Sequence, residues 1–138
     1  MDEQSLYKDV LMEHYRHPHN RGELEQADVI RRGSNPRCGD DIEVGIKYDG
    51  DRLEQVRFRG RGCSICIASA SMMTDAVQGK SREEASQLYQ KMKQWFEEEM
   101  ATEPLESLRP LAAVRSHSAR RRCVLLSWEA LEDALEDE

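Results

Sequence analysis

Residues 42–59 read IEVGIKYDGDRLEQVRFR, and this stretch decides the fold because it encodes two strands and the turn between them. Apolar and polar residues alternate on both sides of Asp49-Gly50, as expected for strands with one buried face and one wetter face. The Asp49-Gly50 dipeptide favours a tight hairpin turn, because glycine tolerates positive φ angles. We therefore predict an antiparallel hairpin in the middle of the chain.

Segments with helical patterns lie on both sides of this hairpin. Before it, apolar residues recur at helical spacing between Ser5, a suitable N-cap, and Pro18, and a short strand follows at residues 29–30. After it, residues 65–77 are apolar or small on all sides, which predicts a buried helix ended by Gly79. Three further helices are expected: one after a capping box of Ser81 and Glu84, a short one around residues 105–111, and one from about Arg121. This order predicts an α+β fold in which helices pack against a small three-stranded antiparallel sheet.

Length and composition restrict the classes of protein that need considering. The chain has 138 residues with 27 acidic and 20 basic side chains, so its formal net charge is -7. This length suits one domain, residues 1–138, in which residues 128–138 form the end of the last helix and an acidic tail. The acidic balance argues against nucleic-acid binding. No run approaches the roughly 20 apolar residues of a membrane span, and no signal peptide is evident. We expect a cytoplasmic protein that binds neither nucleic acid nor membrane.

Four cysteines are the main candidates for chemistry. In a reducing compartment, cysteines more often bind metals or react than form disulfides. Cys38, Cys63 and Cys123 fall at the ends of predicted elements, where binding sites are often built. A helix N-terminus and nearby arginines are expected to give Cys63 and Cys123 thiolate character. Three thiolates and the carboxylate of Asp40 would suit Zn²⁺, although four unrelated buried cysteines are the alternative.

The motif Cys63-Ser64-Ile65-Cys66 has two further interpretations. A Cys-x-x-Cys motif at a strand-to-helix junction is also typical of thioredoxin-like redox sites, but no βαβ unit precedes this one. Cys66 is either a fourth metal ligand or a buried residue in the first turn of an apolar helix. The residue pattern leaves both interpretations open.

The histidines are weaker candidates. His14, His17 and His19 resemble a metal cluster, but two of them flank Pro18 at a helix end and cannot share a helical face. We expect packing, capping or exposure for these three side chains. His117 is either a polar group near the site or an exposed loop histidine.

Arginines are concentrated near the cysteines. The chain has 15 arginines and five lysines, and the arginine clusters lie within a few residues of cysteines. Their positive charge would offset the charge of an anionic metal site. The cluster from Arg120 to Arg122 is either a partner-docking patch or a solvated helix face.

Ordered motifs span nearly the whole chain: Leu6-Tyr7, His14-Tyr15-x-x-Pro18-x-Asn20, Asn35-Pro36-x-Cys38-Gly39-Asp40, Gly60-x-Gly62-Cys63-Ser64-Ile65, Ala68-Ser69-Ala70-Ser71-Met72-Met73, Arg120-x-x-Cys123 and Leu126-x-Trp128-x-Ala130-Leu131. Together they resemble the IscU/NifU-type iron-sulfur assembly proteins. The serine-rich run, the long segment between Cys63 and Cys123 and the last motif fit the SufU branch of this family best.

The resemblance implies a site and a set of partners. In such proteins Cys38, Asp40, Cys63 and Cys123 would bind zinc or, in scaffold members, a transient [2Fe-2S] cluster. Cys66 stands where SufU-like sequences usually have a serine, which makes it the candidate substitute ligand. Cys38 would be the sulfur acceptor. The implied donor is a pyridoxal-phosphate-dependent cysteine desulfurase of the SufS type, whose own ligand displaces the acceptor cysteine from zinc. A downstream iron-sulfur assembly complex would receive the sulfur, and Arg120 and Arg122 are the candidates for partner docking.

Two functional hypotheses follow, and both use the same four residues. The first is a zinc-dependent sulfurtransferase that accepts persulfide sulfur, and the second is a non-enzymatic scaffold for a [2Fe-2S] cluster. A structural zinc protein is a third alternative. The chain lacks the Leu-Pro-Pro-Val-Lys motif of IscU scaffolds and has Ala119-Arg120-Arg121-Arg122 where those scaffolds carry a histidine before the third cysteine, which argues against docking of an Hsp70-type chaperone. The sequence leaves the metal open, because iron and zinc compete for similar thiolate sites.

Overall fold

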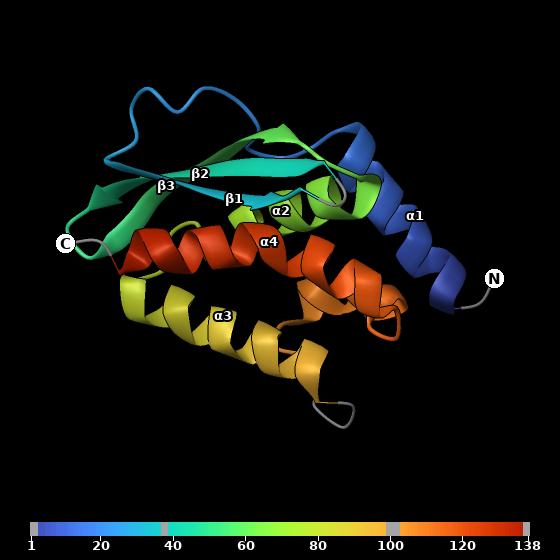
Figure 1. The fold of residues 1–138 in the computed structure, drawn as a ribbon. Coiled ribbons are helices and arrows are strands. Elements are labelled where there is room, and N and C mark those ends of the chain that lie inside the picture. Colours follow the sequence, from blue (N-terminus) through green and yellow to red (C-terminus); the bar gives the residue numbers. More distant parts are fainter. Residues whose placement is uncertain (1–2, 37–38, 99–102, 137–138) are drawn as a thin grey trace.

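A three-stranded sheet and the helices on one of its faces form the body of the molecule (Figure 1). The computed structural model describes residues 3–36, 39–98 and 103–136. The elements follow in the order α1 (Glu3–Arg16), β1 (Val29–Asn35), β2 (Asp40–Asp49), β3 (Arg52–Arg61), α2 (Ser64–Val77), α3 (Arg82–Glu97), the 3₁₀ helix η1 (Glu106–Val114) and α4 (Ser118–Leu135). The strands pair antiparallel in the order β1-β2-β3, which confirms the predicted fold class.

The hairpin predicted from residues 42–59 is confirmed. Strand β2 ends at Asp49, β3 begins at Arg52, and Gly50 in the turn has a φ of 61°. On β2, the side chains of Ile42, Val44 and Ile46 are fully buried. Strand β1 is longer than the two residues predicted, because its polar second half pairs with β2 as far as Asn35.

Helices cover the two faces of the sheet unequally. Helices α2 and α4 pack against the strands, and α3 packs on the side of α4 that faces away from the sheet (Figure 1). Residues 17–28 run across the opposite face as an irregular segment (Figure 1). Leu24 in this segment is buried, and a Cβ placed on Gly45 of β2 would lie 3.0 Å from the Ala27 Cβ. The glycine therefore allows the segment to pack directly on the central strand.

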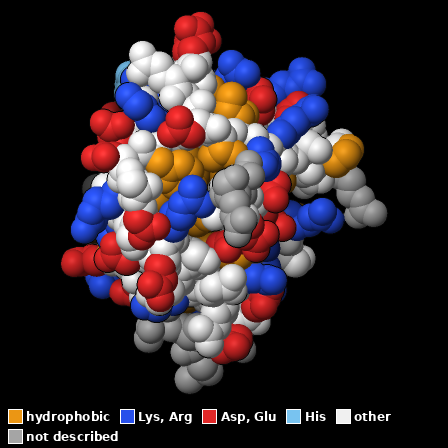
Figure 2. Space-filling model, turned by 90° about the vertical axis from the view of Figure 1, so that its left-hand side faces the viewer, with side chains coloured by type: hydrophobic (Ala, Val, Ile, Leu, Met, Phe, Trp, Pro, Cys, Tyr) orange, Lys and Arg blue, Asp and Glu red, His pale blue; other side chains and the backbone are white. Residues whose placement is uncertain are grey.

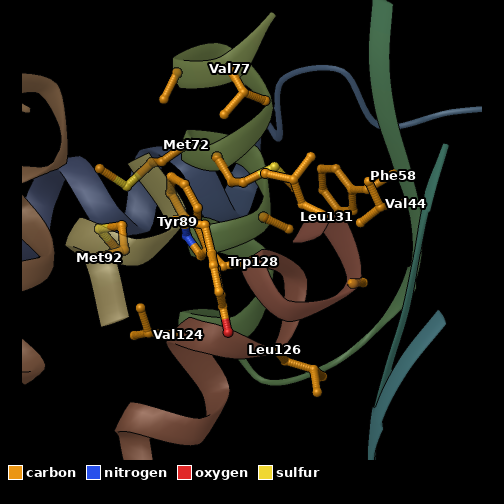
Figure 3. Packing of buried hydrophobic residues seen from close by; sticks show 14 of the residues in the cluster. Val44, Phe58, Met72, Val77, Tyr89, Met92, Val124, Leu126, Trp128 and Leu131 are labelled. Carbon is orange, nitrogen blue, oxygen red and sulfur yellow. The ribbon is translucent and has the colours of Figure 1, made fainter. Parts of the chain in front are cut away.

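The hydrophobic core lies between the sheet and α3. Figure 3 shows Val44 and Phe58 of the sheet beside Leu131 of α4, whereas Trp128 of α4 lies among side chains of α3. Helix α2 is buried on nearly all sides, as predicted from its composition: only Asp75 of the residues from 65 to 77 is exposed. The core is economical, because a few large side chains buried between layers fill much of it.

The predicted helix boundaries are correct at some ends and wrong at others. The capping box of Ser81 and Glu84 is confirmed, and α2 ends before Gly79, whose φ is 88°. Helix α1, however, begins by Glu3, so Ser5 lies inside it. Helix α4 begins at Ser118 and not at Arg121, which moves its N-terminus one turn towards the start of the chain.

Charged side chains of both signs are mixed on the surface. Figure 2 shows the end of the molecule that bears the C-terminus, where Lys and Arg side chains lie interspersed with Asp and Glu around a small apolar area. None of the helices in residues 3–36, 39–98 and 103–136 has the length and apolar character of a membrane span.

Candidate metal centre

The antiparallel topology brings the end of β1, the start of β2 and the end of β3 together at one end of the sheet. Asn35, the last residue of β1, pairs with Asp40, the first residue of β2, and Asp41 pairs with Arg61 at the end of β3. The chain then continues through Gly62 to Cys63, which is the N-cap residue of α2. Residues far apart in sequence are thus gathered at the junction of the sheet and α2.

Three potential metal ligands meet at this junction. One ligand atom from each of Asp40, Cys63 and Cys123 lies within 4.8 Å of the other two. Asp40 is 1% exposed and Cys123 is 2% exposed, whereas Cys63 is partly accessible. The three side chains come from β2, the start of α2 and α4, so the packing of these elements fixes their arrangement. Three of the four predicted site residues therefore lie together.

The two carboxylate oxygens of Asp40 have different surroundings. The backbone N–H of Cys63 donates a hydrogen bond of 2.9 Å to Asp40 Oδ1. Asp40 Oδ2 is buried and has no hydrogen-bond partner among the residues that the structure describes. A buried carboxylate oxygen without a partner is costly, and a bound cation would satisfy it. The donor set of one carboxylate and two thiols matches the ligands that Zn²⁺ takes in proteins, so these residues fit a zinc ion.

The thiol of Cys123 depends on a cation to become a ligand. Burial, together with the neighbouring Cys63 and Asp40, raises the pKa of Cys123 to about 12. Its S–H donates to the carbonyl of Ala119 over 3.8 Å, one turn earlier in α4. The prediction of thiolate character from a helix N-terminus is therefore wrong for Cys123 in the protein alone, because this residue lies inside α4 and in an apolar setting. A divalent cation would reverse this preference, since coordination deprotonates a thiol.

Cys66 lies next to the group but outside it. Its side chain is fully buried in the first turn of α2, and the ligand group formed by the described residues does not include its sulfur. A Cβ on Gly62 would lie 3.0 Å from both the Cys66 Sγ and Asp40 Oδ1, so the chain passes very close to both side chains. An antiparallel hairpin precedes α2, and the βαβ context of a thioredoxin-like site is absent from the described part of the chain.

Other predicted site residues have separate positions. Cys38 lies outside the described residues. Arg120 and Arg122 are exposed in the first turns of α4, and the exposed His117 immediately precedes that helix.

Several arginines near the cysteines pair with surface carboxylates. Arg32 donates two hydrogen bonds of 2.6 Å to Asp41, and this guanidinium holds the pKa of Asp41 below its usual value. Arg59 likewise pairs with Glu43 at 3.0 Å. These arginines neutralise carboxylates on the sheet surface, and they are not aimed at the ligand group as the sequence suggested.

The histidines contain a second group that sequence reasoning missed. His17 is exposed, as expected, but His14 and His19 lie together with their ring centroids 4.6 Å apart, and Asp75 joins them. Burial, and then the charge of His19, lower the pKa of His14. The chain reverses after Pro18, so residues that cannot share a helical face still meet. Two signals were present in the sequence: the closely spaced histidines themselves, and Asp75, an acidic residue in an otherwise apolar and small-residue segment.

Comparisons with known proteins agree with this fold. The model of the NifU-like N-terminal domain family matches residues 6–137, and the chain belongs to this family. The prediction of an IscU/NifU-type protein with SufU-like features is therefore confirmed.

Individual relatives cover the chain almost completely. The zinc-dependent sulfurtransferase SufU of Bacillus subtilis is 42% identical over 137 residues, covering 97% of this chain and 92% of the relative. The iron-sulfur cluster assembly scaffold protein IscU of Streptococcus pyogenes is 40% identical over 133 residues, covering 94% and 82% of the two chains. The crystal structure of the SUF-system protein FiSufU from Fervidobacterium islandicum superposes with a TM-score of 0.79 at 27% identity, covering 98% of this chain and 100% of the other.

Proposed function

We propose that this protein is a zinc-dependent sulfur acceptor in iron-sulfur cluster assembly. In this proposal Asp40, Cys63 and Cys123 hold a zinc ion together with Cys38, and Cys38 accepts sulfur from the persulfide of a cysteine desulfurase. The donor is a pyridoxal-phosphate-dependent enzyme of the SufS type, and a downstream assembly complex takes the sulfur. The observation that carries the proposal is the group of Asp40, Cys63 and Cys123 in a chain 42% identical to a zinc-dependent sulfurtransferase.

The burial of the described cysteines supports Cys38 as the acceptor. Cys66 and Cys123 are 0% and 2% exposed, so neither sulfur is accessible to the persulfide of another protein. Cys63 is more accessible, but it is the N-cap residue of α2 and its backbone N–H is bonded to Asp40. Cys38 is two peptide links from Asp40, so its Cα lies within about 7.6 Å of the Asp40 Cα by chain geometry alone. Chain length alone therefore allows Cys38 to reach the same group.

The transfer itself is a thiol-persulfide exchange. The Cys38 thiolate attacks the outer sulfur of the desulfurase persulfide, a new S–S bond forms on Cys38, and the S–S bond on the desulfurase breaks. The desulfurase cysteine leaves as a thiolate, so charge, protons and redox state balance without another reagent. A second exchange of the same kind, with a thiol of the recipient, would remove the sulfur from Cys38.

The fixed residues prepare the acceptor for this exchange. When zinc is bound, it keeps its cysteine ligands deprotonated at neutral pH, where a thiol with an ordinary pKa is mostly protonated. Asp40 and Cys123 hold their positions by burial, and Cys63 holds its position through its bond to Asp40. Their burial keeps water away from one side of the site. The reacting cysteine is then the ligand from the segment between β1 and β2.

We place the proposed docking surface for the desulfurase at the N-terminal part of α4. A surface cavity of about 830 Å³ lies beside Cys63, and Ser64, Ile65, His117 and Arg120 are among its lining residues. Arg122 lines a neighbouring hollow of about 320 Å³ together with Arg32. The exposed side chains of Arg120 and Arg122 thus lie on both sides of the turn that precedes Cys123. We propose that they bind acidic groups of the desulfurase.

Desulfurase assays with the full, zinc-loaded chain test this function. We expect turnover of a SufS-type desulfurase to rise when the chain is added, and peptide mapping after alkylation to locate a persulfide on Cys38. Cys38→Ser should abolish both effects, and the matched variant Cys66→Ser should retain them. A zinc-loaded chain that neither raises turnover nor acquires a persulfide would overturn the proposal.

Charge reversal separates docking from chemistry. Arg120→Glu with Arg122→Glu should raise the concentration of this chain needed for half-maximal stimulation and leave the zinc content unchanged. Lys93→Glu, an exposed change on α3, is the control and should have no effect. Equal stimulation by the arginine variants would remove these two residues from the docking surface.

The scaffold function is the alternative, and the 40% identity to an IscU scaffold protein favours it. The same carboxylate and thiols would then hold a [2Fe-2S] cluster. Anaerobic reconstitution with ferrous iron and sulfide distinguishes the two functions. A cluster that forms on the chain and transfers intact to an apo-ferredoxin would support the scaffold, whereas persulfide formation without such transfer supports the sulfur acceptor.

A further inference from the structure

We infer that His14, His19 and Asp75 form a second cation site, which binds a divalent first-row transition metal. The site lies where the C-terminal part of α1 and the segment after it meet the last turn of α2. It is separate from the cysteine group: Cys63 and Asp75 are twelve residues apart along α2, which corresponds to about 18 Å at the rise of an α-helix. The inference does not depend on the proposed sulfur transfer.

The geometry brings three donor groups of different chain segments to one point. One ligand atom from each of His14, His19 and Asp75 lies within 4.8 Å of the other two. The two imidazole rings are 4.6 Å apart between centroids and tilted by 49°, so they are not stacked face to face. His19 Nδ1 lies 2.5 Å from Asp75 Oδ2. A cation would replace the proton shared by this pair.

A set of outer hydrogen bonds holds the three side chains in place. Ser71 Oγ lies 2.7 Å from His14 Nδ1 and accepts the backbone N–H of His19 at 2.8 Å. Asn20 Nδ2 donates to Asp75 Oδ1 at 3.0 Å, which orients the carboxylate. Metal-binding histidines and carboxylates usually have such partners, because these fix the ring orientation and the tautomer. The bond from His14 Nδ1 to Ser71 leaves its Nε2 available.

Backbone strain occurs at the same place. Asn20 has a φ of 59°, and it is the only non-glycine residue with a positive φ in the described part of the chain. Residues other than glycine rarely adopt this left-handed conformation, although asparagine tolerates it better than most, and surrounding contacts maintain it. The Asn20 carbonyl accepts the N–H of Phe58, and its side chain also donates to Thr74 at 3.1 Å. The chain reversal that these contacts maintain is what sets His19 against His14.

The donor set determines the class of cation. Two imidazoles and one carboxylate suit iron(II), nickel(II), zinc(II) and their neighbours, whereas calcium and magnesium prefer oxygen ligands alone. The site contains no thiol, so its donor atoms are harder ligands, in the sense of hard and soft acids and bases, than those of the cysteine group at the other end of α2. His19 and Asp75 have side chains 53% and 44% exposed, so water or an incoming group can complete the coordination. Such an open site favours rapid exchange of the metal.

Zinc titration of the full chain, followed on the histidine rings, tests this inference. The first equivalent is added to fill the cysteine group, and further zinc is then added while long-range ¹H–¹⁵N spectra report the imidazole nitrogens. We expect the ring nitrogens of His14 and His19 to shift and those of His17 to stay unchanged. Calorimetry should detect a second binding event, weakened at least ~10-fold by His19→Gln and by Asp75→Asn.

His17→Gln is the matched control, because it removes an exposed histidine of the same segment. It should retain the second event at full affinity. Unchanged His14 and His19 signals in excess zinc would overturn the inference, as would equal binding by His19→Gln and the parent chain. The side chains of His19 and Asp75 are exposed, so we expect both variants to fold. Thermal unfolding checks this expectation. His14→Gln offers an independent readout if either variant does not fold.

Discussion

Asp40 lies beside the two described cysteines of the ligand group and is hydrogen-bonded to one of them, Cys63. One carboxylate oxygen accepts the Cys63 N–H, and the other is buried without a partner among the described residues. Asp40→Asn keeps the size of the side chain but removes its charge and one acceptor. We expect the zinc affinity of the full chain to fall at least ~10-fold in a competition with a chelator.

Asp41→Asn provides the control for this change. Asp41 is the next residue of β2, but its carboxylate binds Arg32 on the sheet surface. Its replacement should leave zinc affinity unchanged. An equal loss of affinity in both variants would show that the effect comes from the sheet edge in general and would contradict a ligand role for Asp40.

Gly60 illustrates how the backbone near the site restricts the sequence. Its φ is 130°, and an added Cβ would lie 2.1 Å from the carbonyl oxygen of Asp41, beside the ligand residue Asp40. We expect Gly60→Ala to lower the free energy of unfolding by about 3 kcal/mol or more. Gly50→Ala is the comparison, because Gly50 also has a positive φ but a Cβ there meets nothing within 4 Å. Urea unfolding should give a loss of only about 1–2 kcal/mol there, and similar losses in both variants would contradict this account.

Two buried serines on adjacent helices show how α2 and α4 are joined. The Ser69 hydroxyl of α2 donates to the Val124 carbonyl of α4 at 2.7 Å, whereas the Ser127 hydroxyl of α4 has no partner among the described residues. Ser69→Ala should lower the free energy of unfolding by about 0.5–1.5 kcal/mol, because the bond between the two helices is lost. Ser127→Ala makes the same chemical change and should be neutral or stabilising. If urea unfolding shows equal losses, the interhelix bond does not stabilise the molecule.

The capping box at the start of α3 makes stability depend on pH. The backbone N–H of Ser81 donates to the Glu84 carboxylate and lowers its pKa below 4.5. A depressed pKa contributes stability above the unfolded value of about 4.5, and this contribution is lost as the pH falls through the folded value. Glu84→Gln keeps an acceptor but not the charge. We expect its melting temperature to lie below that of the parent chain near pH 7 and to converge with it as the pH falls below 4.5; a constant difference would contradict this.

Elements with local signals were predictable, and elements that depend on distant partners were less so. The hairpin at Asp49-Gly50 and the capping box at Ser81 are determined by residues that are neighbours in the sequence. The polar half of β1 is a strand only because β2 pairs with it. The start of α4 carries no side-chain capping bond at His117, which explains why the sequence placed it about one turn too late.

At the scale of the whole molecule, the topology explains how much of the site could be predicted. Asp40 was a candidate because it follows Cys38-Gly39, and the family resemblance favoured it over Cys66, since nothing in its own residue type distinguishes it from the other 26 acidic side chains. Its burial against Cys63 and Cys123 depends on how the sheet and two helices pack. The meeting of His14 and His19 depends likewise on a chain reversal stabilised by contacts with β3 and α2. Local patterns contain neither kind of information.

X-ray absorption at the zinc edge of the full, zinc-loaded chain tests the central claim most directly, because it reports the atoms bound to the metal. The proposed set of Asp40, Cys38, Cys63 and Cys123 predicts three sulfur ligands at about 2.3 Å and one oxygen at about 2.0–2.2 Å. Cys66→Ser should give the same spectrum, because its sulfur lies outside the ligand group. Four sulfur ligands in the parent chain, falling to three in Cys66→Ser, would contradict the account.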